Sequence, residues 1–200
     1  MILYIIRHGE TMWNALRKVQ GATDIELNEK GIAYARLTGE ALAQVSFDLA
    51  FSSPLKRAVD TARYVLNGRE VPLYTDKRIQ EISFGIMEGT QIDGPFKREF
   101  DYFFHDTKKY TAPEGGESIE DVCRRTRDFW EELTGTERFQ NATILIATHG
   151  CAGRALLQSV YKDGDFWHGC VPPNCCVNIV EVKNGEARLL AEDKIYYKNR

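Results

Sequence analysis

The stretch ILYIIRHGET, residues 2–11, places five apolar residues directly before an arginine and a histidine. An apolar run of this length, rich in β-branched residues, predicts a buried strand over residues 2–6. At its end, the guanidinium of Arg7 offers a planar fork of N–H donors that fits phosphate oxygens. The imidazole of His8 titrates near neutrality and is able to attack phosphorus or carry a proton. The stretch therefore predicts a strand end that handles phosphate.

A second apolar run, residues 47–51, also leads into a cationic side chain. Ser53 is suited to the N-cap of a helix and Pro54 to its first position, so we expect a helix to begin here. Arg57 then lies in the first turn and off the apolar stripe of that helix. The N-terminus of a helix favours anions, which makes Arg57 a second candidate for phosphate binding.

A third apolar run, residues 143–148, ends in a second histidine. Ligand sites of open α/β sheets lie beyond the carboxyl ends of the strands. If the three strands are neighbours, the side chains at their ends meet in one crevice. These side chains are Arg7, His8, Arg57 and His149. Such a set supplies a phosphate with several donors and a nucleophile, and the chemistry requires no metal.

Strand and helix signals alternate along the chain, with no linker and no internal repeat. We expect one α/β domain, residues 1–200, in which helices flank a mostly parallel central sheet. Asn28 predicts the N-cap of a helix, and Ser118 with Asp121 forms a pattern like a capping box. The dipeptide Asn184-Gly185 predicts a C-terminal hairpin.

Composition limits the class of protein further. A hydrophobic fraction of 43% with 28% charged residues is typical of a globular chain, and a net charge of −3 gives no general reason to expect nucleic acid as a partner. We expect no membrane segment and no signal peptide, because every apolar run is too short and the first lacks a basic flank. The five cysteines show no CxxC spacing, which favours reduced thiols in the cytoplasm over a disulfide framework or a metal site. The oligomeric state stays open.

Eight segments form an ordered set of motifs along the chain. They are residues 7–14 (RHGETMWN), 20–24 (QGATD), 53–58 (SPLKRA), 61–62 (TA), 81–85 (EISFG), 88–89 (EG), 113–118 (PEGGES) and 148–150 (THG). In this order they resemble the histidine phosphatase superfamily, in its phosphoglycerate-mutase-like branch. Two positions depart from the pattern, since Glu26 stands where the family often has proline and Met87 where it often has tryptophan. Neither position carries the chemistry, so we expect effects on packing or substrate fit only.

The resemblance implies a phosphoglycerate-mutase-like fold and a role for each residue at the strand ends. His8 is the expected nucleophile, and it forms a phosphohistidine intermediate that divides the transfer into two steps. Arg7, Arg57 and His149 are expected to stabilise the transferring phosphoryl group as its oxygens gather charge.

The resemblance also implies a proton donor and a substrate-binding set. The motif at residues 81–85 assigns the donor to Glu81, in preference to Glu10 or Glu88. The expected substrate-binding residues are Asn14, Gly21, Thr23 and Gly150.

The class of reaction is the harder prediction. Phosphatases and mutases of this superfamily both form phosphohistidine, and they differ in whether water or a substrate hydroxyl receives the phosphoryl group. This chain is short, and its stretch EISFGIMEG, residues 81–89, resembles the phosphatase branch more closely. We therefore predict a metal-independent phosphatase that needs no cofactor and acts on a small phosphorylated metabolite. The alternatives are a cofactor-dependent phosphoglycerate mutase and a catalytically silent module that binds a phosphorylated ligand.

The segment 93–110 leaves two interpretations open, as a substrate lid or as core packing. Its four phenylalanines have helical spacing, which favours core packing. Its basic residues are candidates for holding a second anionic group of the substrate, although a solvated helix face is the favoured interpretation. These basic residues are Lys97, Arg98, Lys108 and Lys109. The sequence does not specify the substrate itself.

Overall fold

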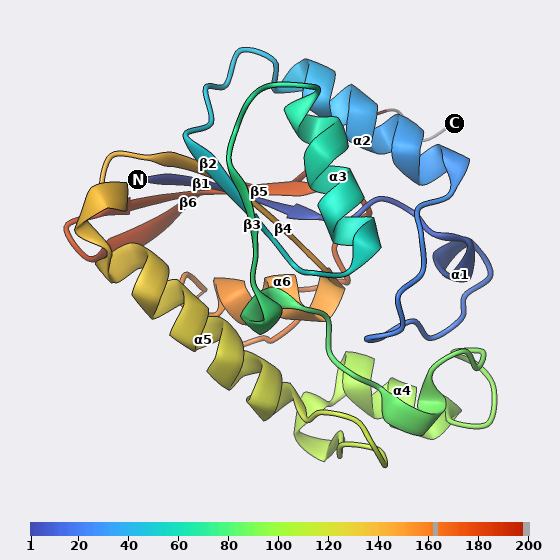
Figure 1. The fold of residues 1–200 in the computed structure, drawn as a ribbon. Coiled ribbons are helices and arrows are strands. Elements are labelled where there is room, and N and C mark those ends of the chain that lie inside the picture. The colour runs from blue at the N-terminus through green and yellow to red at the C-terminus, as the bar shows by residue number, and fades with distance from the viewer. Residues whose placement is uncertain (162–163, 198–200) are drawn as a thin grey trace.

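A six-stranded sheet forms the centre of the computed structural model, which describes residues 1–161 and 164–197 (Figure 1). The strands are β1 (Ile2–Arg7), β2 (Leu49–Ser52), β3 (Leu73–Thr75), β4 (Thr143–Thr148), β5 (Val177–Lys183) and β6 (Glu186–Lys194). Their order in the sheet is β3-β2-β4-β1-β5-β6. The first four of these are mutually parallel, whereas β5 and β6 form an antiparallel pair at one edge. The predicted fold, a mostly parallel sheet with a C-terminal hairpin, is confirmed.

The three strands that carry the polar junctions are neighbours in this sheet. β4 lies between β1 and β2, and its register places Arg7 opposite Thr148. The amide of His8 donates to the carbonyl of Thr148 at 2.9 Å, and the amide of Ser53 donates to that of Ala147 at 2.9 Å. All three strands are thus neighbours and end at the same level, which is the arrangement that brings the side chains at their ends into one crevice.

Helices cover both faces of the sheet. On one face lie α2 (Glu29–Ala41) and α3 (Lys56–Leu66), and on the other lie α5 (Ile119–Gly135) and α6 (Gly150–Leu157) (Figure 1). Side chains of β4 alternate between the two layers: Leu145 and Ala147 pack in the cluster that contains α3, and Ile144 and Ile146 pack in the cluster that contains α5 and α6. Because both faces of this strand are buried, the residues between its two terminal threonines are all apolar, which explains the sequence of residues 143–148.

The remaining helices are short. They are α1 (Met12–Ala15), α4 (Lys97–His105) and the 3₁₀ turns Lys77–Ile79, Gly85–Met87, Thr107–Lys109 and Glu137–Phe139. Phe100 and Phe103 of α4 are buried in a third apolar cluster with Phe84 and Trp167, so the core-packing interpretation holds for these two phenylalanines. Within the described ranges, no helix combines the length and the apolar character needed to cross a bilayer.

The predicted start of α3 is wrong by two residues. Ser53 was expected to be the N-cap and Pro54 the first helical residue, but the helix begins at Lys56. Its N-cap residue, Leu55, forms no capping hydrogen bond with its side chain. Instead, the carboxylate of Asp24 accepts a hydrogen bond from the amide of Lys56 at 2.8 Å. A distant loop thus satisfies the donor that a local cap was expected to satisfy. Arg57 still lies in the first turn, as predicted.

The two other predicted caps are confirmed. The side chain of Asn28 accepts a hydrogen bond from the amide of Gly31 at 2.8 Å and begins α2. Ser118 and Asp121 form a reciprocal capping box at the start of α5. Both motifs lie within four consecutive residues, which is why sequence inspection finds them.

The capping box of α5 gives the first prediction. Ser118→Ala removes the oxygen that accepts from the amide of Asp121 and should lower the free energy of unfolding by about 1 kcal/mol. Chemical denaturation measures this change. The matched control is Thr134→Ala, which removes a hydroxyl that donates to a carbonyl of the same helix and should change the free energy by less than about 0.5 kcal/mol. Equal losses in the two variants would contradict the capping role.

Candidate active site

Two histidines and an arginine meet in the interior at the carboxyl ends of β1 and β4. The rings of His8 and His149 lie 5.1 Å apart between centroids, and Nε of Arg57 donates to Nδ1 of His149 at 3.2 Å. The exposed fractions of His8, Arg57 and His149 are 2%, 0% and 1%. Burial of this kind is costly for polar side chains unless hydrogen bonds or a ligand satisfy them.

The hydrogen bonds of His8 fix its tautomer. Nδ1 lies 2.7 Å from the carbonyl oxygen of Gly9, and a carbonyl only accepts, so Nδ1 carries the proton. Burial, together with the positive charges of Arg57 and Arg7, holds the pKa of His8 well below its usual range. The ring is therefore neutral, and Nε2 keeps a lone pair that is available for attack on phosphorus.

His149 is held in the opposite tautomer. Because Nδ1 accepts from Arg57, the proton of the neutral ring lies on Nε2. Burial and the charge of Arg57 hold the pKa of His149 well below its usual range. Nε2 of His149 and Nε of Arg7 are buried and have no hydrogen-bond partner among the described residues. The site thus presents two unsatisfied N–H donors, one of them on the ring that lies beside His8.

Arg57 is fixed by backbone carbonyls of the preceding loop. Its two terminal nitrogens donate to the carbonyl of Thr23 at 2.7 Å and to that of Gly21 at 2.6 Å. Burial lowers the pKa of Arg57 to about 10, so the side chain stays charged at neutral pH. Gly21 adopts a φ of 54°, the left-handed region that glycine tolerates best.

The side-chain carboxylate of Glu81 lies at the N-terminus of α6 and binds its first backbone amides. One carboxylate oxygen accepts from the amides of Gly150 at 3.0 Å and Cys151 at 3.3 Å, and the other accepts from those of Ala152 and Ile82, each at 3.0 Å. An anion at a helix N-terminus is favourable. Four N–H donors fill the lone pairs of both oxygens, so a proton on Glu81 requires at least one of these bonds to open.

The two other candidate carboxylates are engaged elsewhere. Glu88 accepts from the amides of Ala22 and Phe84 at 2.9 Å, from the amide of Thr23 at 2.8 Å and from the hydroxyl of Thr23. It thereby clamps the loop that holds Arg57. Glu10 binds the side chains of Asn28 and Lys30.

A cavity of about 110 Å³ opens beside His8. The predicted site residues that line it are Arg7, His8, Asn14, Gly21, Glu81 and Gly150. Arg57, Thr23 and His149 lie outside this lining and connect to it through the hydrogen bonds described above. Among the three candidate proton donors, only Glu81 lines the cavity.

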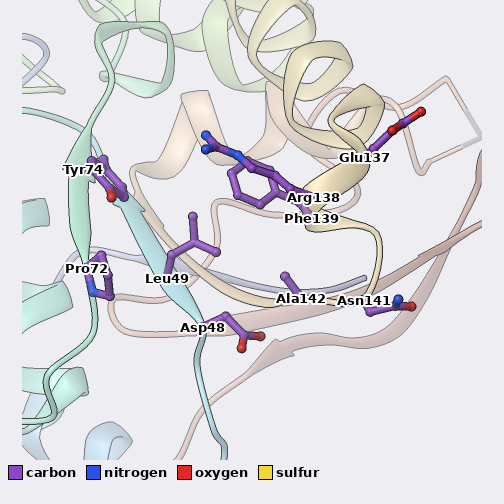
Figure 2. A pocket seen from close by; sticks show the side chains of 9 residues that line it. All are labelled: Asp48, Leu49, Pro72, Tyr74, Glu137, Arg138, Phe139, Asn141 and Ala142. Atoms are coloured by element: carbon purple, nitrogen blue, oxygen red, sulfur yellow. The ribbon is translucent and has the colours of Figure 1, made fainter.

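A larger cavity, of about 460 Å³, lies at the opposite end of the sheet (Figure 2). Asp48 directly precedes β2 and Ala142 directly precedes β4, so this cavity borders the amino ends of the parallel strands. Ligand sites of such sheets lie at the carboxyl ends. The candidate active site is therefore the smaller cavity beside His8.

Three contacts that support the site are not predicted from the sequence. Nδ2 of Asn174 donates to the carbonyl of His8 at 3.0 Å, and a terminal nitrogen of Arg7 donates to the carbonyl of Pro172. The third is the clamp that Glu88 forms. The stretch around Pro172 shows only a turn signal in the sequence, and a turn signal does not reveal what the turn contacts.

A model of the histidine phosphatase superfamily (branch 1) matches residues 3–193 of the chain. The chain therefore belongs to this superfamily, and the resemblance drawn from its motifs is confirmed. In the region that the structure describes, no three His, Cys, Asp or Glu side chains are grouped so that they could hold a metal ion.

Individual relatives carry both mutase and phosphatase names. The chain is 33% identical over 165 residues to a 2,3-bisphosphoglycerate-dependent phosphoglycerate mutase of Cytophaga hutchinsonii, with 80% of this chain and 78% of that protein covered. It is 30% identical to the uncharacterized phosphatase PhoE of Bacillus subtilis, with 92% of this chain and 90% of that protein covered. The solved structure of Bacillus stearothermophilus YhfR superimposes with a TM-score of 0.87 at 32% identity and covers 97% of each chain.

The lowered pKa values of the two histidines predict how stability depends on pH. The unfolded chain takes up protons as pH falls below about 6.5, whereas the folded site resists them. The contribution of these two histidines to the free energy of unfolding is therefore fully present above about pH 6.5. It is lost as pH falls toward the folded-state pKa values, by up to about 1.4 kcal/mol per pH unit for each histidine.

Urea unfolding of variants between pH 7 and pH 5 tests this dependence. His8→Gln should flatten the slope of unfolding free energy against pH. The exposed His105, at the end of α4, provides the matched control as His105→Gln. A slope that His8→Gln leaves at the wild-type value would contradict the assignment of a neutral buried ring.

Proposed function

We propose that the protein is a phosphatase that hydrolyses a small phosphomonoester through a phosphohistidine intermediate on His8. The observation that carries this proposal is the state of His8, a neutral ring with its proton held on Nδ1 by Gly9 and a lone pair on Nε2. Two unsatisfied N–H donors, on Arg7 and His149, lie in the same buried site and suit phosphate oxygens. A buried nucleophile between such donors is what phosphoryl transfer needs.

The first chemical step transfers the phosphoryl group to the protein. Nε2 of His8 forms a bond to phosphorus while the bond from phosphorus to the ester oxygen breaks. Arg7 and His149 donate to the phosphoryl oxygens, and Arg57 supports His149 through its Nε. Glu81 enters this step protonated, with one of its bonds to the backbone amides open, and gives that proton to the leaving alkoxide. In the second step water attacks the phosphohistidine, Glu81 accepts its proton, and His8 is regenerated with release of phosphate.

Positive charge from arginine supports a reaction without a metal. At the phosphate end Arg57 is buried and Arg7 is half-buried, and their attraction for the transferring group strengthens as it gathers negative charge. Asn14 is the best-placed further ligand, because its Oδ1 accepts from the amide of Thr11 and leaves Nδ2 free to donate. Gly21, Thr23 and Gly150 complete the proposed substrate-binding set.

The surroundings favour a phosphatase over a mutase. A mutase must hold a second phosphate group and keep water from the phosphohistidine. The basic residues of segment 93–110 do not line the cavity, and Lys97, Arg98 and Lys109 form exposed ion pairs with acidic neighbours at 2.5, 3.0 and 2.7 Å. A silent binding module would have no use for a nucleophile beside a candidate acid, so catalysis is the better interpretation. The five free thiols support a reducing compartment such as the cytoplasm.

Product analysis with 3-phosphoglycerate separates the two reactions. A phosphatase should release inorganic phosphate in step with the loss of each monoester that it hydrolyses, both with and without EDTA. It should form no 2-phosphoglycerate, even when a bisphosphoglycerate primer is added. Interconversion that depends on the primer and outpaces phosphate release would reject the phosphatase proposal, and loss of activity in EDTA with rescue by a divalent cation would reject the metal-independent mechanism.

The role of Glu81 predicts a dependence on the leaving group. Glu81→Gln keeps the shape of the side chain and removes its proton, so turnover of alkyl phosphates should fall by about 10²–10⁴-fold. Hydrolysis of para-nitrophenyl phosphate, whose leaving group needs little protonation, should fall much less. Glu88→Gln is the matched comparison and should act through the loop that holds Arg57, with equal losses on both substrates. Equal losses in Glu81→Gln would move the acid to another residue.

A further inference from the structure

The cavity beside His8 continues from its phosphate end into a wall of aromatic rings. Five lining residues contribute, namely Phe84, Phe100, Phe103, Phe104 and Trp167. Successive ring centroids lie 5.0 to 5.6 Å apart from Phe84 through Phe103 and Trp167 to Phe104. The rings come from three separate parts of the chain, so the fold assembles this wall and no local sequence pattern produces it.

The wall offers almost no hydrogen bonds to a bound molecule. The indole N–H of Trp167 donates to the carbonyl of Phe103 at 2.7 Å and is therefore not available to a ligand. Gln20 also lines the cavity, and since its side-chain oxygen accepts from the hydroxyl of Thr11, its amide Nε2 is the one group of that side chain left to donate to a ligand. A sugar or glycerol group placed here would leave its hydroxyls facing rings, which costs free energy for each unpaired group.

The cavity also holds little positive charge away from the phosphate end. Besides Arg7, Lys18 is the one basic residue in the lining among those described, and its ammonium lies 5.9 Å from the ring of Trp13. The basic side chains of α4 form exposed ion pairs, such as that of Lys97 with Asp101. A second carboxylate or phosphate on the substrate would meet only Lys18.

We infer that the substrate is a monoester whose alcohol carries an aromatic or other bulky apolar group next to the phosphate. Such a group buries apolar surface against the rings and needs no hydrogen bond, while the phosphate takes the donors of Arg7 and His149. This inference rests on the proposed phosphatase function and names the class of substrate for the same site. Phe104 is the residue to change, because it lines the cavity and is only partly buried.

Alkyl esters with similar leaving groups test the preference without differences in leaving-group acidity. The kcat/KM for 2-phenylethyl phosphate should exceed that for glycerol 1-phosphate and for 3-phosphoglycerate by about tenfold or more. Phe104→Ala should remove most of this advantage, and Phe104→Leu should restore part of it. Tyr102→Ala is the matched control from the same helix, because Tyr102 lies outside the lining, and it should keep the wild-type ratio.

Two readouts separate failure of this inference from failure of the proposed function. Phosphate release from all three esters with equal kcat/KM, or with preference for the polar ones, would overturn the apolar substrate class and leave the phosphatase in place. No phosphate release from any ester would reject the phosphatase. In that case calorimetric binding of 2-phenylethylphosphonate still tests the wall, since binding weakened about tenfold by Phe104→Ala supports it and binding insensitive to that change overturns it.

Discussion

The parallel pairing of β4 with β1 on one side and β2 on the other is the constraint on which the site depends. Since the three strands end at one level, His8 and His149 leave the sheet next to each other, and α3 starts close enough for Arg57 to reach His149. Each of these side chains follows an apolar strand that is buried on both faces. The chemistry of the site is therefore anchored in the part of the fold that is hardest to deform.

Electrostatics then determines what the site accepts. Arg57 is buried and Arg7 half-buried, both are held mainly by backbone carbonyls, and the carboxylate of Glu81 binds the N-terminus of α6. The cations thus lack a carboxylate partner in direct hydrogen-bonded contact among the described residues. Burial and these charges together hold the pKa values of both histidines low and keep the rings neutral, which leaves room for an anion. In the reaction that we propose, the phosphate group of the substrate supplies the missing negative charge.

The sequence predicted the features that depend on residues close together along the chain. Apolar runs followed by charged residues identified the strand ends, and the caps at Asn28 and Ser118 lie within single turns. The start of α3 was predicted wrongly because Asp24, 32 residues before Lys56, supplies the cap. The role of Glu88 and the assembly of the aromatic wall were not predictable for the same reason, since contacts between distant segments create them. The catalytic roles themselves stay predictions that follow from the geometry and the family.

The position of the phosphoryl group on the protein tests the account most directly. A single-turnover reaction with a monoester that the protein hydrolyses, quenched at alkaline pH, should trap phosphate on His8. ³¹P NMR and fragmentation mass spectrometry then locate it on the ring. Because the proton of His8 is held on Nδ1 by Gly9, we expect phosphorylation at Nε2. Phosphate on Nδ1, on His149 or on a cysteine, or turnover with no phosphoenzyme at all, would contradict it.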